Sequence, residues 1–310
     1  MPTSTGSRIL VDAGRTGVRI ARLSGQRVVP VAEGPGLPML AEPGGPHAAG
    51  HALASLLPRG EQIEVIAAGL TGLMEVPART EEVAAALRRA TGARRAVLTS
   101  DVVTSHLGAL GGRTGVVAAV GTGTVVLGIG TEGRWAKVDG WGYLVGDAGS
   151  GYDIGRRGLA AALAAHDGRL TTRLQAAAEA RFGPLAELPG WLYAQPEPVH
   201  IVASFSREVA EAARAGDLAA LGIVDGAADA VEAAVRAALV RCQLRGSQRR
   251  VALTGSLGRL DLLQDRVRTR LARHDDPVTV TEAGGDALAG AALLLSEPQP
   301  WLDRLIHVSG

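Results

Sequence analysis

The sequence predicts an α/β protein made of two copies of a β-β-β-α-β-α-β-α unit, with a helical insertion in the second copy. Short apolar runs bounded by turn residues indicate strands, and stretches of helical spacing lie between them. The same order of elements restarts near Val116. A chain of 310 residues, 46% of them hydrophobic, can bury a large core. We therefore predict two domains, at residues 1–113 and 114–310, with the insertion at about 152–245.

The first copy begins with three strands in succession, joined by turns at Gly14 and Gly25. Strands and helices then alternate. The strands are predicted at residues 8–11, 18–23, 27–32, 64–68 and 96–99, and the helices at 47–57, 81–90 and 102–110.

The second copy repeats this order around an insertion that is rich in alanine, a strong helix former. Its strands are predicted at 116–120, 125–129, 134–138, 250–253 and 278–281. A helix at 257–272 follows the fourth strand, and a helix at 287–295 follows the fifth. The insertion is predicted to hold helices at 152–165, 171–181, 199–214 and 218–244. A loop inside it is marked by Pro184, Pro189, Pro196 and Pro198.

Composition excludes several classes of function. The formal net charge is only +1, which gives no electrostatic basis for binding nucleic acid. We expect no membrane span, because no run of about 18 apolar residues occurs. Residues 1–7 lack an apolar signal core, so we expect a cytoplasmic protein. Cys242 is the single cysteine, which excludes an intramolecular disulfide.

The segment from Gly140 to Gly151 is rich in glycine and carries the carboxylate of Asp147. Glycine allows close approach of a ligand, and a carboxylate accepts hydrogen bonds from hydroxyl groups. Ser150 can cap the helix that follows. The residues alone leave open whether this loop binds a ligand or only connects two elements.

Two small turns occupy equivalent places in the two copies. The first hairpin of each copy contains a turn whose backbone amides and threonine hydroxyls can donate to phosphate oxygens. If the two domains face each other across a cleft, both turns would contribute to it. The candidate residues are Asp12, Gly14, Arg15 and Thr16 in the first turn, and Gly121, Thr122, Gly123 and Thr124 in the second.

These motifs together resemble those of the N-acetylglucosamine kinase-like and BadF/BadG/BcrA/BcrD-type ATPases, a branch of the sugar kinase, actin and heat-shock ATPase superfamily. The glycine-rich loop and the Ile154-Gly155-Arg156-Arg157 segment after it match the sugar-kinase signature. Thr254-Gly255-Ser256 matches the adenosine-side motif, and residues 284–291 match the closing helix. The resemblance implies two actin-like (ribonuclease H-like) domains.

The resemblance also implies an ATP- and Mg²⁺-dependent kinase that phosphorylates an amino sugar such as N-acetylglucosamine or glucosamine, and it leaves a homodimer open. By position, Asp101 would be the general base that accepts the proton of the sugar hydroxyl. The residues alone also allow Asp101 to be only a helix cap. Asp12 would organise Mg²⁺ through water. Gly255 and Ser256 would contact the nucleotide, whereas Gly140, Trp141, Asp147, Gly151 and Asp101 would contact the sugar.

The chain departs from the family pattern at a few positions. Arg15 replaces a glycine of the first phosphate turn, where it would either bind phosphate or cover the turn. Ala148 replaces a carboxylate, and residues 34–39 replace a sugar-contacting asparagine. The alternative function is therefore a catalytically degenerate member that binds sugar or nucleotide as a regulator. Trp141 could equally be a core aromatic residue.

Overall fold

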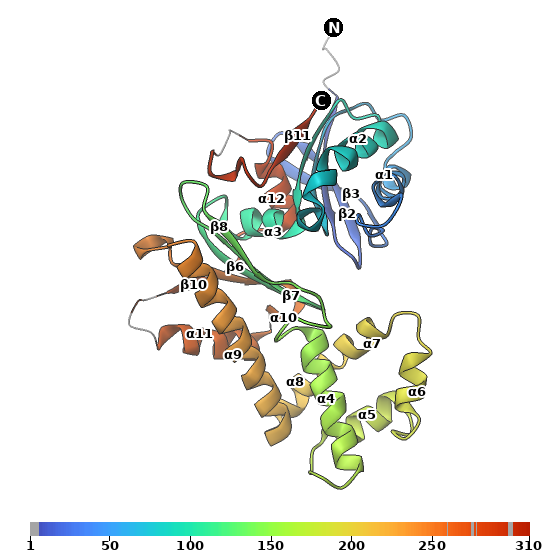
Figure 1. Ribbon diagram of the computed structural model, residues 1–310, viewed down its shortest axis with the longest axis vertical. Coiled ribbons are helices and arrows are strands. Elements are labelled where there is room, and N and C mark those ends of the chain that lie inside the picture. The colour runs from blue at the N-terminus through green and yellow to red at the C-terminus, as the bar shows by residue number, and fades with distance from the viewer. Residues whose placement is uncertain (1–5, 259, 274–275, 277, 297–299) are drawn as a thin grey trace. The chain divides into compact units, whose positions relative to one another are not determined.

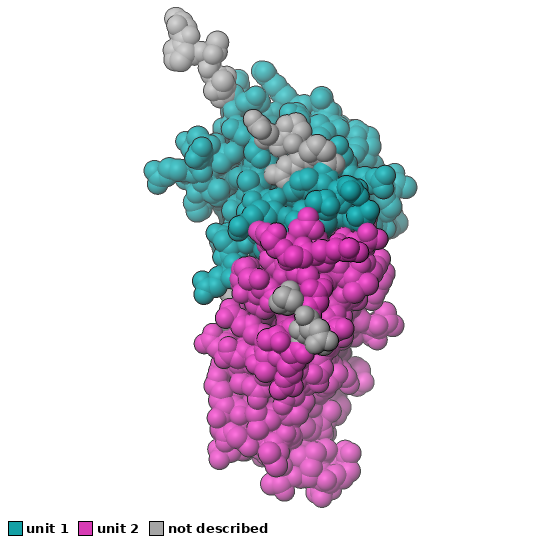
Figure 2. Space-filling model, turned by 90° about the vertical axis from the view of Figure 1, so that its left-hand side faces the viewer, with its two compact units in different colours: residues 1–114, 129–134, 282–310 teal, residues 115–128, 135–281 magenta. Residues whose placement is uncertain are grey.

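The computed structural model describes residues 6–258, 260–273, 276, 278–296 and 300–310. These residues form two compact units (Figures 1 and 2). Unit 1 holds the described residues up to Thr114, the segment Ile129–Arg134 and the residues from Glu282 onward. Unit 2 holds Gly115–Gly128 and Trp135–Thr281.

Unit 1 is built on a mixed six-stranded sheet in the order β11-β5-β4-β1-β2-β3. Strands β1, β2 and β3 form an antiparallel meander, while β4 and β5 run parallel to β1. The strands are β1 (Ser7–Ala13), β2 (Val18–Ser24), β3 (Arg27–Gly34), β4 (Ile63–Leu70), β5 (Arg95–Ser100) and β11 (His307–Ser309). The predicted strands of the first copy are confirmed, and no end lies more than two residues beyond its predicted position.

Helices cover both faces of this sheet, so its central strands are buried on both sides (Figure 1). Helices α1 (Gly45–Leu56) and α2 (Thr80–Thr91) enclose the core that contains Ile9 and Val11. The intervening Leu10 faces the opposite core, together with residues of α12 (Ala287–Leu293). Helix α3 (Asp101–Leu110) packs against α12. Two single-turn 3₁₀ helices, Leu73–Glu75 and Pro77–Arg79, lead into α2.

Unit 2 repeats the topology of unit 1. Its five strands run in the order β10-β9-β6-β7-β8, which matches β5-β4-β1-β2-β3 position by position. The strands are β6 (Gly115–Val120), β7 (Thr124–Ile129), β8 (Trp135–Asp139), β9 (Arg250–Thr254) and β10 (Thr279–Thr281). The predicted α/β fold with a duplicated unit is therefore confirmed.

The insertion in unit 2 is a set of helices packed around one apolar core. It contains α4 (Gly151–His166), α5 (Leu174–Phe182), α6 (Leu188–Tyr193), α7 (Pro198–Ser204), α8 (Ser206–Arg214) and α9 (Leu218–Arg241). The helix predicted at 199–214 is divided at Phe205, whose ring is fully buried in this core. The predicted proline loop contains the short helix α6. Pro189 lies in the first turn of this helix, where a residue without an amide hydrogen removes no helical hydrogen bond.

The end of the chain differs most from the sequence-based expectation. The helix predicted at 257–272 forms as α10 (Gly255–Gly258) and α11 (Asp261–Ala272), with a 3₁₀ turn at Gly246–Gln248 before β9. Residues from Glu282 onward, predicted in the second domain, group with unit 1. There α12 covers one face of the sheet. A 3₁₀ turn at Pro300–Leu302 leads to β11, a strand that was not predicted and that pairs with β5. No helix in the described parts of the chain is long and apolar enough to cross a membrane.

Helices α3 and α12 touch backbone to backbone through glycine. A Cβ atom at Gly290 would lie 1.8 Å from the Thr104 carbonyl oxygen, and one at Gly108 would lie 1.8 Å from the Asp286 carbonyl oxygen. No side chain fits at either position unless the helices separate. This contact fixes the N-terminus of α12 beside α3.

We expect Gly290→Ala to destabilise the protein by about 1–3 kcal/mol or more, because the obstructing atom is a backbone carbonyl that cannot rotate away. Denaturant unfolding measures the change. Gly222→Ala in α9 is the matched control, since a Cβ there meets nothing within 4 Å. That control should stabilise by up to about 1 kcal/mol through helix propensity. Equal stability of Gly290→Ala and the wild type would contradict the close contact.

Candidate functional site

The first of the two candidate turns joins β1 to β2 and is closed by a hydrogen bond from the Gly14 amide to the Gly17 carbonyl oxygen at 2.9 Å. Arg15 and Thr16 are exposed at its tip. Arg15 is not among the residues with left-handed φ, so an L-residue fits there without backbone strain. A Cβ at Gly36 would lie 1.8 Å from the Arg15 carbonyl oxygen, so the segment after β3 packs directly on this turn.

Asp12 lies at the end of β1 and is bound by an arginine that the sequence analysis did not single out. Arg19 Nη2 and Nε donate to Asp12 Oδ2 at 2.6 and 3.1 Å. Arg19 Nη1 also donates to Asp286 Oδ2 at 2.7 Å. Asp286 caps α12 through its other oxygen, which accepts from the Ala289 amide. One guanidinium therefore joins the hairpin to the start of the closing helix.

Burial raises the pKa of Asp12 above its ordinary value, while the hydrogen bonds and charge of Arg19 oppose this effect. The nearby charge of Asp286 raises the pKa of Asp12 further. Asp12 thus lies among charges of both signs in a partly buried setting.

Asp101 is the first residue of α3. Its Oδ1 accepts hydrogen bonds from the Val102 amide at 2.8 Å and the Ser100 hydroxyl at 3.0 Å. Within the described chain no hydrogen bond to Oδ2 occurs. Burial is the main cause that raises the pKa of Asp101, and the charge of Asp12 adds to it. Unit 1 therefore brings Asp12 and Asp101 within electrostatic reach of each other.

The second candidate turn, between β6 and β7, is held by the N-terminus of α4. The amides of Gly151 and Tyr152 donate to the carbonyl oxygens of Gly121 and Thr122, at 2.7 and 3.1 Å. Inside the turn, the Gly121 amide donates to the Gly123 carbonyl oxygen at 2.8 Å. Gly151 thus supports the turn. Its predicted contact with the sugar stays a prediction.

Two other predicted residues meet this turn within unit 2. A Cβ at Gly123 would lie 2.6 Å from Asp147 Oδ2, so that carboxylate lies directly against the turn. A Cβ at Gly121 would be 4.0 Å from the Ser256 hydroxyl oxygen. Gly255, with φ of +82°, lets the chain leave β9 beside Val120. The second turn, Asp147 and the Gly255-Ser256 corner therefore form one cluster.

Two aspartates that the sequence analysis did not identify shape the glycine-rich loop. Asp139 accepts hydrogen bonds from the amides of Gly140, Asp147 and Ala148, at 2.7–2.9 Å. Asp153 Oδ2 accepts from the Gly149 amide at 3.1 Å. The signal that could have identified Asp139 is its place at the end of a strand, directly before the loop.

The start of α4 confirms the predicted cap, because the Ser150 hydroxyl accepts from the Asp153 amide. Asp153 also pairs with Arg157 at 2.9 Å and Arg156 at 3.4 Å. The arginine pair of the signature therefore holds the carboxylate that accepts from the Gly149 amide at the end of the loop.

The tip of the loop exposes apolar side chains. Trp141 is 69% exposed and Val145 is 83% exposed, so Trp141 is not a core residue. Lys137 Nζ lies 5.5 Å from the centre of the Trp141 ring, within range of a cation–π contact. An exposed indole beside a cluster of polar groups is a surface on which an apolar sugar face could stack.

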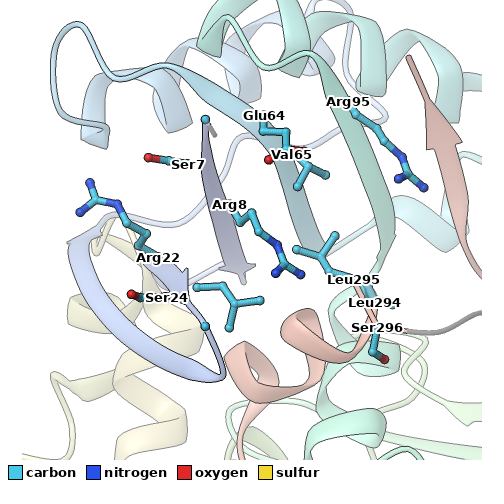
Figure 3. Close-up of a pocket in the computed structure, with 13 residues that line it drawn as sticks. Ser7, Arg8, Arg22, Ser24, Glu64, Val65, Arg95, Leu294, Leu295 and Ser296 are labelled. Atoms are coloured by element: carbon cyan, nitrogen blue, oxygen red, sulfur yellow. The ribbon is translucent and has the colours of Figure 1, made fainter. Parts of the chain in front are cut away.

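A hollow of about 720 Å³ opens elsewhere on unit 1 (Figure 3). Arg8, Arg22 and Arg95 line it, with Leu294 and Leu295 along one wall. It contains none of the predicted site residues. Arg8 and Asp12 are four residues apart on β1, about 13 Å along the strand. The hollow therefore lies toward the start of the strands, away from the end that carries Asp12.

A family model for the BadF/BadG/BcrA/BcrD ATPases matches residues 47–294, most of the chain. The chain belongs to the BadF/BadG/BcrA/BcrD ATPase family. An N-acetylmuramic acid/N-acetylglucosamine kinase of Clostridium acetobutylicum is 28% identical over 64% of this chain. An N-acetyl-D-glucosamine kinase of Dictyostelium discoideum is 29% identical over 62% of it. The matches span 66% and 62% of those relatives, slightly less than two thirds of each.

Solved structures share the fold of this chain. A Chromobacterium violaceum protein assigned as an N-acetylglucosamine kinase superposes with a TM-score of 0.75 at 27% identity, covering 95% of this chain and all of that one. A ROK family glucokinase from Streptomyces griseus, solved with glucose and AMPPNP, gives 0.58 at 18% identity, with 93% and 98% covered. The second likeness concerns the fold alone. Together they confirm the actin-like two-domain fold.

Two buried hydroxyls in this BadF/BadG/BcrA/BcrD ATPase lack partners. Thr124 Oγ1 and Thr254 Oγ1 make no hydrogen bond within the described chain, although Thr124 is only 2% exposed. Both threonines flank the cluster in unit 2, at the second turn and before Gly255. A buried hydroxyl without a partner is costly and is commonly satisfied by a bound group. A phosphate or nucleotide oxygen fits this donor set.

We expect Asp139→Asn to loosen the glycine-rich loop, because the charged acceptor of three amides is lost, and each such bond contributes about 1.5–3 kcal/mol. Hydrogen exchange at the amides of Asp147 and Ala148 should become about tenfold faster or more. Asp167→Asn is the control, since Asp167 pairs only with Arg169 on the surface. Unchanged exchange in Asp139→Asn would contradict the role of Asp139.

Proposed function

We propose that this protein is an ATP-dependent sugar kinase that transfers the γ-phosphate to a hydroxyl of an amino sugar such as N-acetylglucosamine or glucosamine. Family membership supports the use of ATP, and the printed names of the relatives support an amino sugar as the acceptor. The observation that carries the proposal is the environment of Asp101, a carboxylate with a free oxygen and a raised pKa near a second carboxylate.

Asp101 has the properties that a general base requires. The sugar hydroxyl must lose its proton as its oxygen bonds to the γ-phosphorus and the bond to the leaving ADP oxygen breaks. Asp101 Oδ2 would accept that proton, while the hydrogen bonds to Oδ1 hold the carboxylate in place. The raised pKa makes Asp101 a stronger base than an exposed aspartate.

Unit 2 supplies groups suited to the phosphates and to the sugar. In this proposal the amides and hydroxyls of the Gly121–Thr124 turn, with Ser256, bind ATP. Asp147 and Trp141 bind the sugar, the first by accepting hydrogen bonds from hydroxyls and the second by stacking. The orphaned Thr124 and Thr254 hydroxyls support a ligand in this cluster.

The donor set of unit 1 also fits Mg²⁺. Mg²⁺ in phosphoryl-transfer enzymes is held by one or two carboxylates together with water and substrate phosphates. Asp12 and Asp286 both bind the same guanidinium, so each carboxylate already has a cation as its partner. When bound, Mg²⁺ would neutralise the charge that develops on the transferred phosphoryl group.

The altered first turn favours a second candidate function, a catalytically degenerate regulator that binds sugar or nucleotide. Arg15 replaces a glycine in that turn, and Ala148 replaces a carboxylate in the signature loop. Steady-state ATP turnover with a panel of N-acetylglucosamine, glucosamine, N-acetylmuramic acid and glucose separates the two. No turnover with any sugar, with sugar binding retained by calorimetry, would favour the regulator.

We expect Asp101→Asn to lower kcat by about 10²–10⁴ while sugar binding persists, because the amide cannot accept the proton. In the wild type the acid limb of the pH–rate profile should lie above the ordinary aspartate pKa of 3.8, since the pKa of Asp101 is raised. Steady-state kinetics across pH measures both. Near-normal kcat in the variant would contradict the assignment.

The same variant also tests how Asp101 affects the free energy of unfolding. A raised pKa in the folded state means that stability falls as pH rises from 3.8 through the folded pKa of Asp101. Asp101→Asn removes that cost, so at pH 7 it should be at least as stable as the wild type. The control is Asp217→Asn: hydrogen bonds to this helix cap outweigh burial and lower the pKa of Asp217. That control should lose stability and keep activity.

We expect Arg15→Gly to bind ATP more tightly than the wild type. Arg15 is exposed at the tip of the turn, and on this interpretation its side chain would cover amides that could otherwise face phosphate. Calorimetry with a non-hydrolysable ATP analogue measures the change. The alternative is that Arg15 itself contacts a phosphate. A loss of nucleotide affinity in Arg15→Gly would establish that alternative.

A further inference from the structure

We propose that Arg19 is a built-in counter-cation for Asp12 and Asp286, and that it competes with Mg²⁺ for these carboxylates. The inference rests on the proposed use of Mg²⁺ at Asp12. It adds a residue that neither the sequence motifs nor the relatives' names assign. In the chain without metal, the guanidinium would hold the site closed, and metal binding would require its release.

The contacts of Arg19 use most of its donor capacity on these two carboxylates. Nε and Nη2 both donate to Asp12 Oδ2, and Nη1 donates to Asp286 Oδ2 at 2.7 Å. The planar guanidinium therefore lies between the two carboxylates and occupies Oδ2 of each. The side chain of Asp12 is only 20% exposed, which limits other routes to its Oδ2.

The fold places Arg19 there through two independent constraints. The hairpin register pairs Asp12 directly with Arg19 across β1 and β2, so their side chains lie on one face of the sheet. The close contact of α3 with α12 fixes Asp286 at the helix N-terminus. The arginine is therefore held between elements that are far apart in sequence.

A guanidinium and Mg²⁺ cannot both bind the same face of Asp12 without repulsion between the two cations. Removing the guanidinium leaves two facing carboxylates, an arrangement that favours a divalent cation. If Arg19 were only a structural brace, its removal would lower stability and leave cation affinity unchanged or weaker. The two roles therefore predict opposite changes in metal affinity.

Mn²⁺ alone is the probe, followed by the loss of its free-ion electron paramagnetic resonance signal in the full chain without nucleotide. Arg19→Gln should bind Mn²⁺ about tenfold more tightly or more than the wild type. The double variant Arg19→Gln, Asp12→Asn should lose that gain. Arg22→Gln is the matched control, since Arg22 lies on the same strand but pairs with Glu61. Its Mn²⁺ affinity should equal that of the wild type.

Equal or weaker Mn²⁺ binding by Arg19→Gln would overturn the proposal. Arg19→Lys serves if Arg19→Gln does not fold, because lysine keeps one charge and loses the two-pronged contact. Its Mn²⁺ affinity should exceed that of the wild type, and an affinity at or below the wild-type value would equally overturn the proposal. The described residues hold no group of three or more metal-ligating side chains, so they offer no obvious competing site.

A second measurement separates this inference from the proposed kinase activity. In a sugar-dependent assay, Arg19→Gln should reach half-maximal rate at a lower free Mg²⁺ concentration than the wild type. Absence of turnover in the wild type with every sugar would refute the kinase proposal. The Mn²⁺ titration would still test the role of Arg19, because it requires neither sugar nor ATP.

Discussion

The close contact between α3 and α12 is the constraint on which the polar site of unit 1 depends. The two helices are more than 170 residues apart in the sequence, yet they meet with glycine Cα atoms against backbone carbonyls. Asp101 begins one helix and Asp286 caps the other, so the contact sets the places of both carboxylates. Arg19 then links this helix pair to the β1–β2 hairpin. The site thus derives its geometry from backbone packing, which side-chain motion cannot easily change.

In unit 2, hydrogen bonds rather than backbone packing fix the geometry of the candidate site. Its glycine-rich loop buries little apolar surface and exposes an apolar tip, so packing cannot define its shape. Carboxylates define its shape instead. Asp139 accepts hydrogen bonds from three backbone amides of the loop, and Asp153, in the first turn of α4, accepts one from Gly149. Charge-assisted hydrogen bonds to backbone amides are strong enough to hold a loop in which glycine disfavours order. A ligand would then meet a loop that is already formed.

The sequence predicted those parts of the fold in which local pattern and final environment agree. The continuous apolar run of β1 and the alanine-rich α9 are examples, and so is the capping serine before α4. It failed where a distant segment decides the outcome. The three residues of β11 carry no strand pattern of their own and form a strand because β5 offers an edge. Arg19 was missed because its partners are set by the register of the hairpin and by a helix more than 260 residues away. The one local signal was that Asp12 and Arg19 are equally distant from the Gly14–Gly17 turn and so pair across the hairpin.

The return of the chain to unit 1 has a consequence for its synthesis. Residues up to Thr114 leave the ribosome about 170 residues before Glu282 does, an interval of about 10–30 s at ordinary rates of translation. During that time β5 has no β11 beside it, and one face of the sheet lacks α12. An uncovered sheet edge and an apolar face invite association with other nascent chains. The emerging first unit therefore exposes this edge and this face until its last helix and strand are made.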